Sequence, residues 1–180
     1  REALGRPGSA EDAQEGAHER QQAGEPAFPG KHVYFGVLLS LFLHAGLLHL
    51  AGNALFLWVF GNNIEDRLGH VPFLAFYLLG GIAATGTHIA VQPSSTVPVV
   101  GASGAIAAVM GAYLVAFPRA PVRTLFALGI FFFVQDVPAA VLLAFWFISQ
   151  FFVGADSSVA WAAHVGGFVF GALVALPIRS

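Results

Sequence analysis

The chain has 180 residues, of which 57% are apolar and 10% are charged, and its formal net charge at pH 7 is −2. Its mean hydropathy of +0.73 exceeds that of an ordinary soluble domain and favours a protein with several membrane spans. The small negative charge excludes a basic surface for nucleic acid, and the lack of cysteine excludes disulfides, zinc–thiolate sites and a thiol nucleophile in this chain.

The charged residues are concentrated at the beginning of the sequence. Ten of the eighteen lie within residues 1–31, a segment that is otherwise rich in Gly, Ala and Gln and poor in bulky apolar groups. Such a composition buries too little apolar surface to fold alone. We therefore expect residues 1–31 to be a polar, flexible leader and residues 32–180 to form a membrane domain.

Five apolar segments follow that we predict to cross the membrane. They are residues 47–60, 72–91, 101–117, 138–153 and 159–177. We expect residues 33–46 to lie at the membrane interface, residues 62–67 to form a polar turn, and the short apolar segment 125–134 to be interfacial or re-entrant. The predicted fold is an all-α bundle that crosses the bilayer several times.

The arginines predict the orientation of these spans. They occupy one set of segment ends, at Arg67, Arg119, Arg123 and Arg179. The loops 92–98 and 154–158, at the other ends, contain no basic residue. Because cytoplasmic loops are enriched in Lys and Arg, the arginine-bearing ends are predicted to be cytoplasmic. The first, third and fifth spans then run from the outside to the inside.

Three polar residues fall at one depth in these three spans. At about 1.5 Å per residue, His49, Ser103 and His164 each lie about 20 Å above the cytoplasmic end of their span. In a hydrocarbon core about 30 Å thick, all three are about 10 Å below the outer surface. Asn53 follows His49 by four residues and shares its helix face. The coincidence predicts a single site that is open to water from the outside.

A serine and a histidine at this depth suit nucleophilic catalysis. A serine hydroxyl needs an adjacent base, and the imidazole of His164 titrates near neutrality, so it is the best base for Ser103. No Asp or Glu is suitably placed, which predicts a Ser–His dyad and not a triad. The Ser103 amide and the side chains of His49 and Asn53 are candidate oxyanion donors, each worth about 3 kcal/mol, and Gly101 lets the backbone approach the substrate.

Small residues predict close packing of the spans that carry this pair. Gly167 and Gly171 form a GxxxG face on the last span, and Gly104 begins a small-residue stripe on the third. Such faces allow helices to approach closely in lipid. Close approach is what would bring His164 within hydrogen-bonding reach of Ser103.

Each feature taken alone has a plainer structural interpretation. A serine in a membrane helix usually bonds to a carbonyl of the preceding turn. A histidine near the end of a span is usually interfacial, and we interpret His70 and His88 in that way. We interpret Glu65 as a carboxylate that anchors a helix end. The functional hypothesis therefore depends on several polar residues sharing one layer.

Four motifs, in order and spacing, resemble those of the rhomboid family of intramembrane serine proteases. They are HAGLLHLAGN at residues 44–53, the glycine–glutamate motif formed by Gly61, Glu65 and Gly69, GASG at residues 101–104, and AHVGGFVFG at residues 163–171. The resemblance implies a six-helix bundle whose first helix is missing here, with residues 1–31 as the loop after it. It also implies transmembrane protein substrates that are cut near their outer end. The proposed chemistry needs no metal or cofactor, and the sequence contains no evident ligand cluster for either.

The resemblance assigns Ser103 as the nucleophile, His164 as the general base, and His49, Asn53 and the Ser103 amide as the oxyanion hole. We expect an integral protein of a bacterial cytoplasmic membrane, with its site open to the outer side. One alternative is an inactive rhomboid-like protein that binds membrane clients. Another is a membrane haem protein with His49, His88 and His164 as axial ligands.

Overall fold

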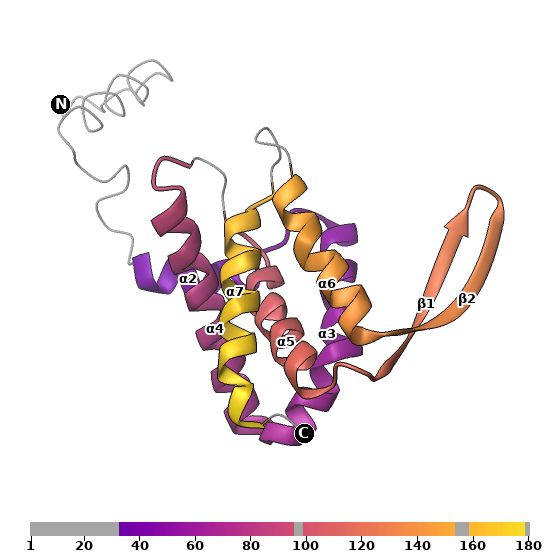
Figure 1. Ribbon diagram of the computed structural model, residues 1–180. Helices are drawn as coiled ribbons and strands as arrows, with labels where there is room; N and C mark the ends of the chain where they lie inside the picture. Colours follow the sequence, from indigo (N-terminus) through magenta and orange to yellow (C-terminus); the bar gives the residue numbers. More distant parts are fainter. Residues whose placement is uncertain (1–32, 96–98, 154–158, 179–180) are drawn as a thin grey trace, which may run out of the picture. The chain divides into compact units, whose positions relative to one another are not determined.

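The computed structural model describes residues 33–95, 99–153 and 159–178 (Figure 1). The chain divides into two units, residues 1–36 and residues 37–180, and the second contains everything described below except the first half of α2. The helices are α2 (Val33–Ser40), α3 (Leu47–Leu68), α4 (His70–Val91), α5 (Ser103–Ala116), α6 (Ala139–Ser149) and α7 (Trp161–Val174). The predicted leader, the loop 154–158, part of the loop 92–98 and Arg179 lie outside the described residues.

Helix α5 forms the centre of the helical bundle. Its sequence is mostly Ala, Gly and Val, and eleven of its fourteen residues are buried. The helices α3, α4, α6 and α7 all pack against it (Figure 1). A helix that is apolar and small on every side suits this position, because neighbours can approach it closely all round. All five segments predicted as spans are helical.

Glycines allow α5 and its neighbours to touch backbone to backbone. A Cβ atom added at Gly171 on α7 would collide with the carbonyl oxygen of Ala108, and one at Gly167 would collide with that of Gly104. On the opposite side, a Cβ at Gly104 would lie 2.6 Å from the Cβ of Ala84 on α4. The contacts at Gly167 and Gly171 hold α5 and α7 side by side, which positions the residues that the two helices carry.

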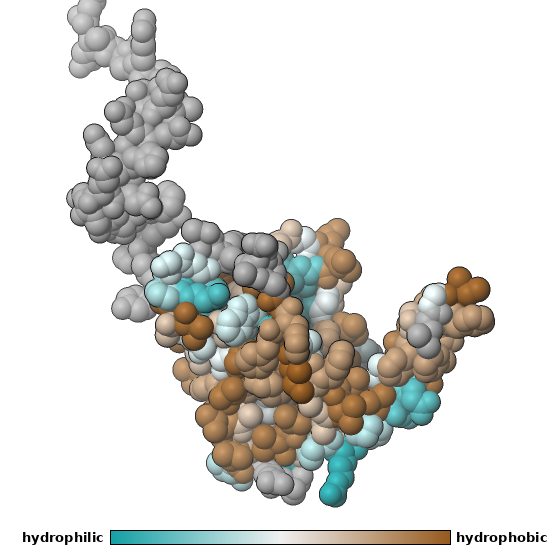
Figure 2. All heavy atoms as spheres, turned by 45° about the horizontal axis from the view of Figure 1, so that its top comes forward, coloured by the Kyte–Doolittle hydropathy of each residue, from teal (hydrophilic) through white to brown (hydrophobic). Residues whose placement is uncertain are grey.

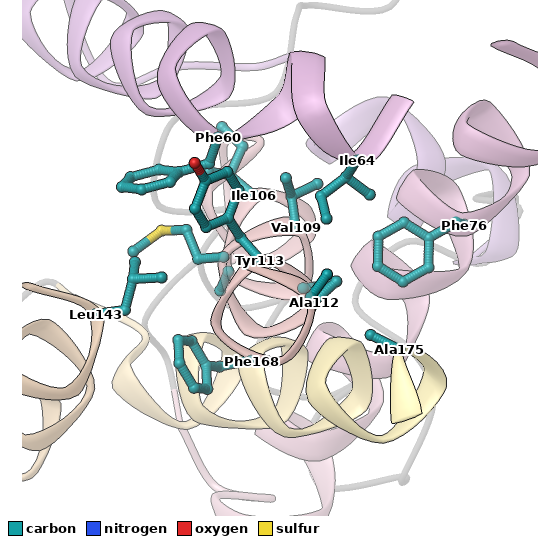
Figure 3. Packing of buried hydrophobic residues seen from close by; sticks show 14 of the residues in the cluster. Phe60, Ile64, Phe76, Ile106, Val109, Ala112, Tyr113, Leu143, Phe168 and Ala175 are labelled. Carbon is teal, nitrogen blue, oxygen red and sulfur yellow. The ribbon is translucent and has the colours of Figure 1, made fainter. Parts of the chain in front are cut away.

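Larger side chains fill the core between α3 and α5. Phe60, Ile64 and Tyr113 are buried in one cluster, and the rings of Phe60 and Tyr113 meet edge to face at 5.0 Å (Figure 3). The amide Nδ2 of Asn63 donates to the Tyr113 hydroxyl at 3.0 Å. The predicted polar turn at residues 62–67 is therefore wrong, because these residues continue α3 and Asn63 finds a partner on α5 without breaking the helix.

The end of α3 is set by Gly69 and Glu65. Gly69 has a φ of +86°, in the left-handed region that glycine adopts readily, and its N–H donates to the Glu65 carbonyl at 2.7 Å. The Glu65 carboxylate lies 2.7 Å from Nδ1 of the exposed His70, the first residue of α4. One turn earlier, Gly61 faces the Leu57 side chain. Glu65 thus anchors a helix end, as the sequence analysis expects.

The segment between α5 and α6 forms an antiparallel hairpin of β1 (Pro121–Leu128) and β2 (Phe131–Pro138). Arg123 therefore lies in strand β1. The sequence predicts an interfacial or re-entrant segment at residues 125–134 and does not indicate strands there. Aromatic and β-branched residues favour the strands. Gly129, with a φ of +61°, allows the tight connection between them.

The outer surface of the helices is strongly apolar. Figure 2 shows hydrophobic residues over most of the visible helical surface, and large side chains such as Trp58, Phe145 and Leu173 are exposed. Among the described helices, α4 is the one both long and apolar enough to cross a membrane by itself. The apolar helices α5, α6 with the 3-10 turn η1 (Gln150–Phe152), and α7 are shorter.

Candidate active site

Ser103 is the first residue of α5, at the end of a sharp change in chain direction. Gly101 has a φ of +102°, and its N–H donates to the Ser40 carbonyl at 2.8 Å. A side chain at Gly101 would lie 2.7 Å from Cε1 of His49, so the backbone is close to that ring. The N–H of Ser103 lies in the first turn of its helix, where amides have no partner within the helix. Ser103 thus presents both a hydroxyl and an amide at a helix N-terminus.

His164, in the first turns of α7, lies against this hydroxyl. Its Nε2 is 2.9 Å from Ser103 Oγ, and its Nδ1 is 2.8 Å from Oε1 of Gln150. The Gln150 amide nitrogen donates to the Trp146 carbonyl at 3.0 Å, which identifies the oxygen as the atom facing the imidazole. Nδ1 of His164 must then carry the proton. Nε2 is left with a lone pair for the Ser103 hydroxyl, as a general base requires.

Two side chains of α3 converge on the same place from the opposite side. The Ala45 amide lies 3.4 Å from Nδ1 of His49, and an amide can only donate, so Nε2 of His49 carries the proton. The Asn53 Nδ2 atom is buried and has no hydrogen-bond partner among the described residues. A Cβ placed at Gly101 would be 3.1 Å from Nε2 of His49 and 3.4 Å from Nδ2 of Asn53. Two N–H donors for which the described residues show no acceptor therefore lie close to the backbone just before Ser103.

These groups line one cavity of about 560 Å³. His49, Asn53, Gly101, Ser103 and His164, which the sequence analysis places in one layer, all border it, as does Gly104. The remaining walls are largely apolar. The arrangement combines a nucleophile, a base in the correct tautomer and at least two donors for a developing oxyanion, which is the set of groups that acyl transfer needs.

His88 lies differently from the sequence-based interpretation, and His44 contacts a residue of the site. His88 is 4% exposed, so it is buried in the protein and not a surface residue, and it does not border the cavity. Neither of its ring nitrogens has a hydrogen-bond partner among the described residues. The ring of His44 packs edge-on against that of His49, with centroids 5.3 Å apart. His44 thus supports a residue of the site.

Gln150 is the residue of the site that the sequence analysis missed. The expectation of a dyad rests on the lack of a suitably placed carboxylate to orient His164. An amide oxygen can accept the same hydrogen bond. The signal was a single Gln at the end of an apolar segment whose neighbours, Phe151 and Phe152, are aromatic.

Comparison with known proteins places this chain in a family. Residues 31–180 match the Rhomboid domain family, which covers every described element. The chain belongs to the rhomboid family, whose members are membrane proteins and include serine proteases.

Individual relatives come from several kinds of organism. The chain is 32% identical over 142 residues to the human presenilin-associated rhomboid-like protein, mitochondrial, with 75% of this chain and 35% of that protein covered. It is 31% identical over 146 residues to Rhomboid protein 1, mitochondrial, of Saccharomyces cerevisiae, covering 76% of this chain and 40% of that protein. It is 38% identical over 81 residues to the Rhomboid protease GluP of Bacillus subtilis, covering 45% of this chain and 15% of that protein. The chain thus spans well under half the length of these relatives.

Proposed function

We propose that this chain carries the active site of an intramembrane serine endopeptidase. The observation that carries the proposal is the 2.9 Å contact between Ser103 Oγ and His164 Nε2, with Nδ1 protonated toward Gln150. In a largely apolar cavity a hydroxyl and an imidazole are costly unless they have a task or a partner. Here each is the other's partner, and the pair faces open space large enough for a peptide segment.

The reaction follows from the positions of these atoms. Ser103 Oγ attacks the carbonyl carbon of the scissile peptide while His164 Nε2 takes the hydroxyl proton. The negative charge that develops on the carbonyl oxygen is met by the N–H groups of His49 Nε2, Asn53 Nδ2 and the Ser103 amide. His164 then gives its proton to the leaving amine, and a water molecule hydrolyses the serine ester by the reverse sequence.

The substrate class follows from the surroundings of the cavity. Its apolar walls and the apolar outer surface of the helices suit a transmembrane segment that enters from the lipid. The arginine distribution puts the Ser103 end of α5 near the outer surface, so we place the cut near the outer end of the substrate. The relatives divide on the expectation of a bacterial cytoplasmic membrane: those from human and yeast are named mitochondrial, whereas GluP comes from Bacillus subtilis.

Labelling with a fluorophosphonate, combined with cleavage of a defined transmembrane substrate in detergent or vesicles, tests the proposal. We expect wild-type protein to be labelled and to cleave, and Ser103→Ala to do neither while remaining folded. Ser40→Ala is the matched control, because the Ser40 hydroxyl bonds to the Val37 carbonyl and takes no part in the chemistry. Cleavage that persists in Ser103→Ala would refute the assignment.

The main alternative is an inactive rhomboid-like protein that binds membrane clients. The experiment above separates the two, because such a protein would bind a transmembrane segment without being labelled at Ser103. A haem protein is disfavoured by the geometry. Both ring nitrogens of His164 are engaged with Ser103 and Gln150, so neither is free for iron, and His88 does not border the cavity.

A further inference from the structure

We propose that Gln150 is a positioning residue that holds His164 in its catalytic tautomer, so that Ser103, His164 and Gln150 act as a triad. This inference deepens the proposed function and rests on it. Its basis is the 2.8 Å contact between Gln150 Oε1 and His164 Nδ1, which joins the end of α6 to α7. The two residues are fourteen apart in sequence and belong to different helices.

The local backbone explains why Gln150 faces inward. Helix α6 ends at Ser149, and the chain tightens into η1 over the next three residues. Gln150 is 7% exposed, whereas Phe151 and Phe152 beside it are exposed. A buried amide in an apolar segment is unfavourable unless its donors and its acceptor are satisfied. The inward turn therefore indicates that the amide has a specific partner.

The hydrogen bonds around the amide fix its orientation. Nε2 of Gln150 donates to the Trp146 carbonyl at 3.0 Å and to Ser149 Oγ at 3.2 Å. Both of its hydrogens are thereby used, and Oε1 is directed at His164. The Trp146 ring packs beside the imidazole, with centroids 5.7 Å apart, and restricts its tilt. The hydrogen bonds of Gln150 Nε2 thus fix the amide group, so that Oε1 can accept from Nδ1 of His164.

A neutral amide differs from a carboxylate in this position. It selects the tautomer with a proton on Nδ1 but offers no negative charge to the imidazolium that forms when Ser103 is deprotonated. Among the residues that line the cavity, His49 on α3 is the other titratable side chain. We therefore expect the acidic limb of the pH–rate profile to report the protonation of His164, with no neighbouring anion to stabilise the imidazolium.

The test uses three variants of the full chain and two kinds of measurement. Gln150→Leu keeps the approximate size and removes the acceptor, Gln150→Glu restores an acceptor, and Gln135→Leu makes the first substitution on the exposed strand β2 as the control. We expect Gln150→Leu to lower kcat by about 10- to 100-fold with little change in KM. Gln150→Glu should recover most of that loss and move the acidic limb of the profile to higher pH, and Gln135→Leu should match wild type.

The second measurement does not depend on activity. In protein labelled with ¹⁵N-histidine and carrying Ser103→Ala, the His164 resonances, identified by their loss in His164→Asn, report which ring nitrogen is protonated. We expect protonated Nδ1 with Gln150 and a mixture of tautomers with Gln150→Leu. An unchanged tautomer and an unchanged kcat in Gln150→Leu would overturn the inference. Absence of labelling and cleavage in wild-type protein would instead refute the proposed function. The ¹⁵N measurement of the His164 tautomer would still test whether Gln150 positions the ring.

A separate observation concerns the hairpin of β1 and β2, and we infer that its tip inserts into the interfacial region of the bilayer. The hairpin leaves the helices at the C-terminal end of α5 and extends away from them (Figures 1 and 2). Its cross-strand pairs change character abruptly. Arg123 faces Asp136 and Thr124 faces Gln135 at the base, whereas the next four pairs toward the tip are apolar on both strands.

Both faces of the tip are apolar, because consecutive residues of each strand point to opposite faces. Leu125 and Phe126 on β1 are exposed, as are all the residues of β2 from Phe131 to Val134 and Ile130 in the connection. A two-stranded sheet that exposes both apolar faces to water is marginally stable and prone to association. Lipid around the tip removes this penalty.

The backbone limits how deep the tip can go. Four pairs at about 3.4 Å each extend about 14 Å, roughly half of a 30 Å hydrocarbon core. The outer edges of the two strands carry unpaired backbone groups, which are costly in hydrocarbon. The polar base, with Arg123 and the nearby exposed Arg119, suits contact with anionic lipid headgroups. A shallow position in the leaflet near the α5 C-terminus satisfies all three constraints.

The absence of native cysteine permits a clean test of this placement. A polarity-sensitive fluorophore is attached to Ile130→Cys at the tip or to Gln135→Cys near the base, in protein reconstituted into vesicles with anionic lipid. We expect blue-shifted emission and strong quenching by nitroxide-labelled lipids at position 130, and weaker quenching at position 135. Equal and weak quenching at both positions would overturn the inference. Energy transfer between tips of separate chains, without lipid quenching, would instead indicate pairing with a second copy and would also overturn it.

Discussion

Asn53→Ala is expected to lower activity while leaving the protein as stable as wild type or more stable. The Nδ2 group of Asn53 is buried and has no partner among the described residues. A donor in this condition costs about 1 to 3 kcal/mol in the resting protein, and its removal relieves that cost. In the transition state the same donor meets the oxyanion and contributes about 3 kcal/mol, so its loss should lower kcat by about 10²-fold.

Asn63→Ala provides a matched control on the same helix. Its Nδ2 donates to the Tyr113 hydroxyl at 3.0 Å and is not part of the site. Removing it should cost about 1 kcal/mol of stability, or about 2–4 °C in Tm, and leave kcat within twofold of wild type. The assays are cleavage kinetics of a transmembrane substrate and thermal unfolding of the purified protein.

The two asparagine variants should therefore show opposite patterns of activity and stability. Asn53→Ala should lose activity and keep or gain stability, whereas Asn63→Ala should keep activity and lose stability. An unchanged kcat in Asn53→Ala would remove that residue from the oxyanion hole. A lower Tm for Asn53→Ala than for Asn63→Ala would show that its amide is satisfied in the resting protein, and the reasoning from its missing partner would be refuted.

Three further variants test other parts of the structure. His164→Ala should remove nearly all cleavage, because His164 is the imidazole in hydrogen-bonding contact with the Ser103 hydroxyl, and retention of a tenth of the wild-type rate would contradict its role. Gly171→Ala should lower Tm by about 4–10 °C, since its Cβ would collide with the Ala108 carbonyl, whereas Gly86→Ala, which has open space, should not. Gly101→Ala should reduce kcat at least tenfold, because the new Cβ would displace the His49 ring. Gly129 also has a positive φ but no neighbour within 4 Å, so Gly129→Ala should preserve kcat. Equal kcat values for the two variants would show that His49 is not displaced.

The site shows where local sequence reasoning stops. Ser103, His164, His49 and Asn53 could be found because apolar spans make rare polar residues conspicuous, and a fixed rise per residue gives each of them a depth. Gln150 could not be assigned in this way. Its role depends on the turn from α6 into η1 and on the distance to α7, and neither is encoded by spacing along the chain.

The same distinction applies to the elements. The interpretation of residues 62–67 as a turn rested on their polarity, but Asn63 and Arg67 find partners in Tyr113 and the Phe117 ring, so α3 continues through them. Residues 125–134 were correctly singled out as too short for a span. These residues show no alternation of apolar and polar side chains, because nearly every position is apolar. Periodicity therefore could not distinguish a strand from a helix.

What the amino-acid sequence determined by itself was the apolar helical bundle, the order of its helices and the layer in which its polar residues lie. These follow from composition and from the rise of a helix, which are local properties. The tertiary structure decided which atoms meet: the protonated nitrogen of His164, the unused donors of His49 and Asn53, and the amide of Gln150. Such contacts depend on how closely α5, α6 and α7 approach one another, and the shapes of all the packed side chains set that approach together.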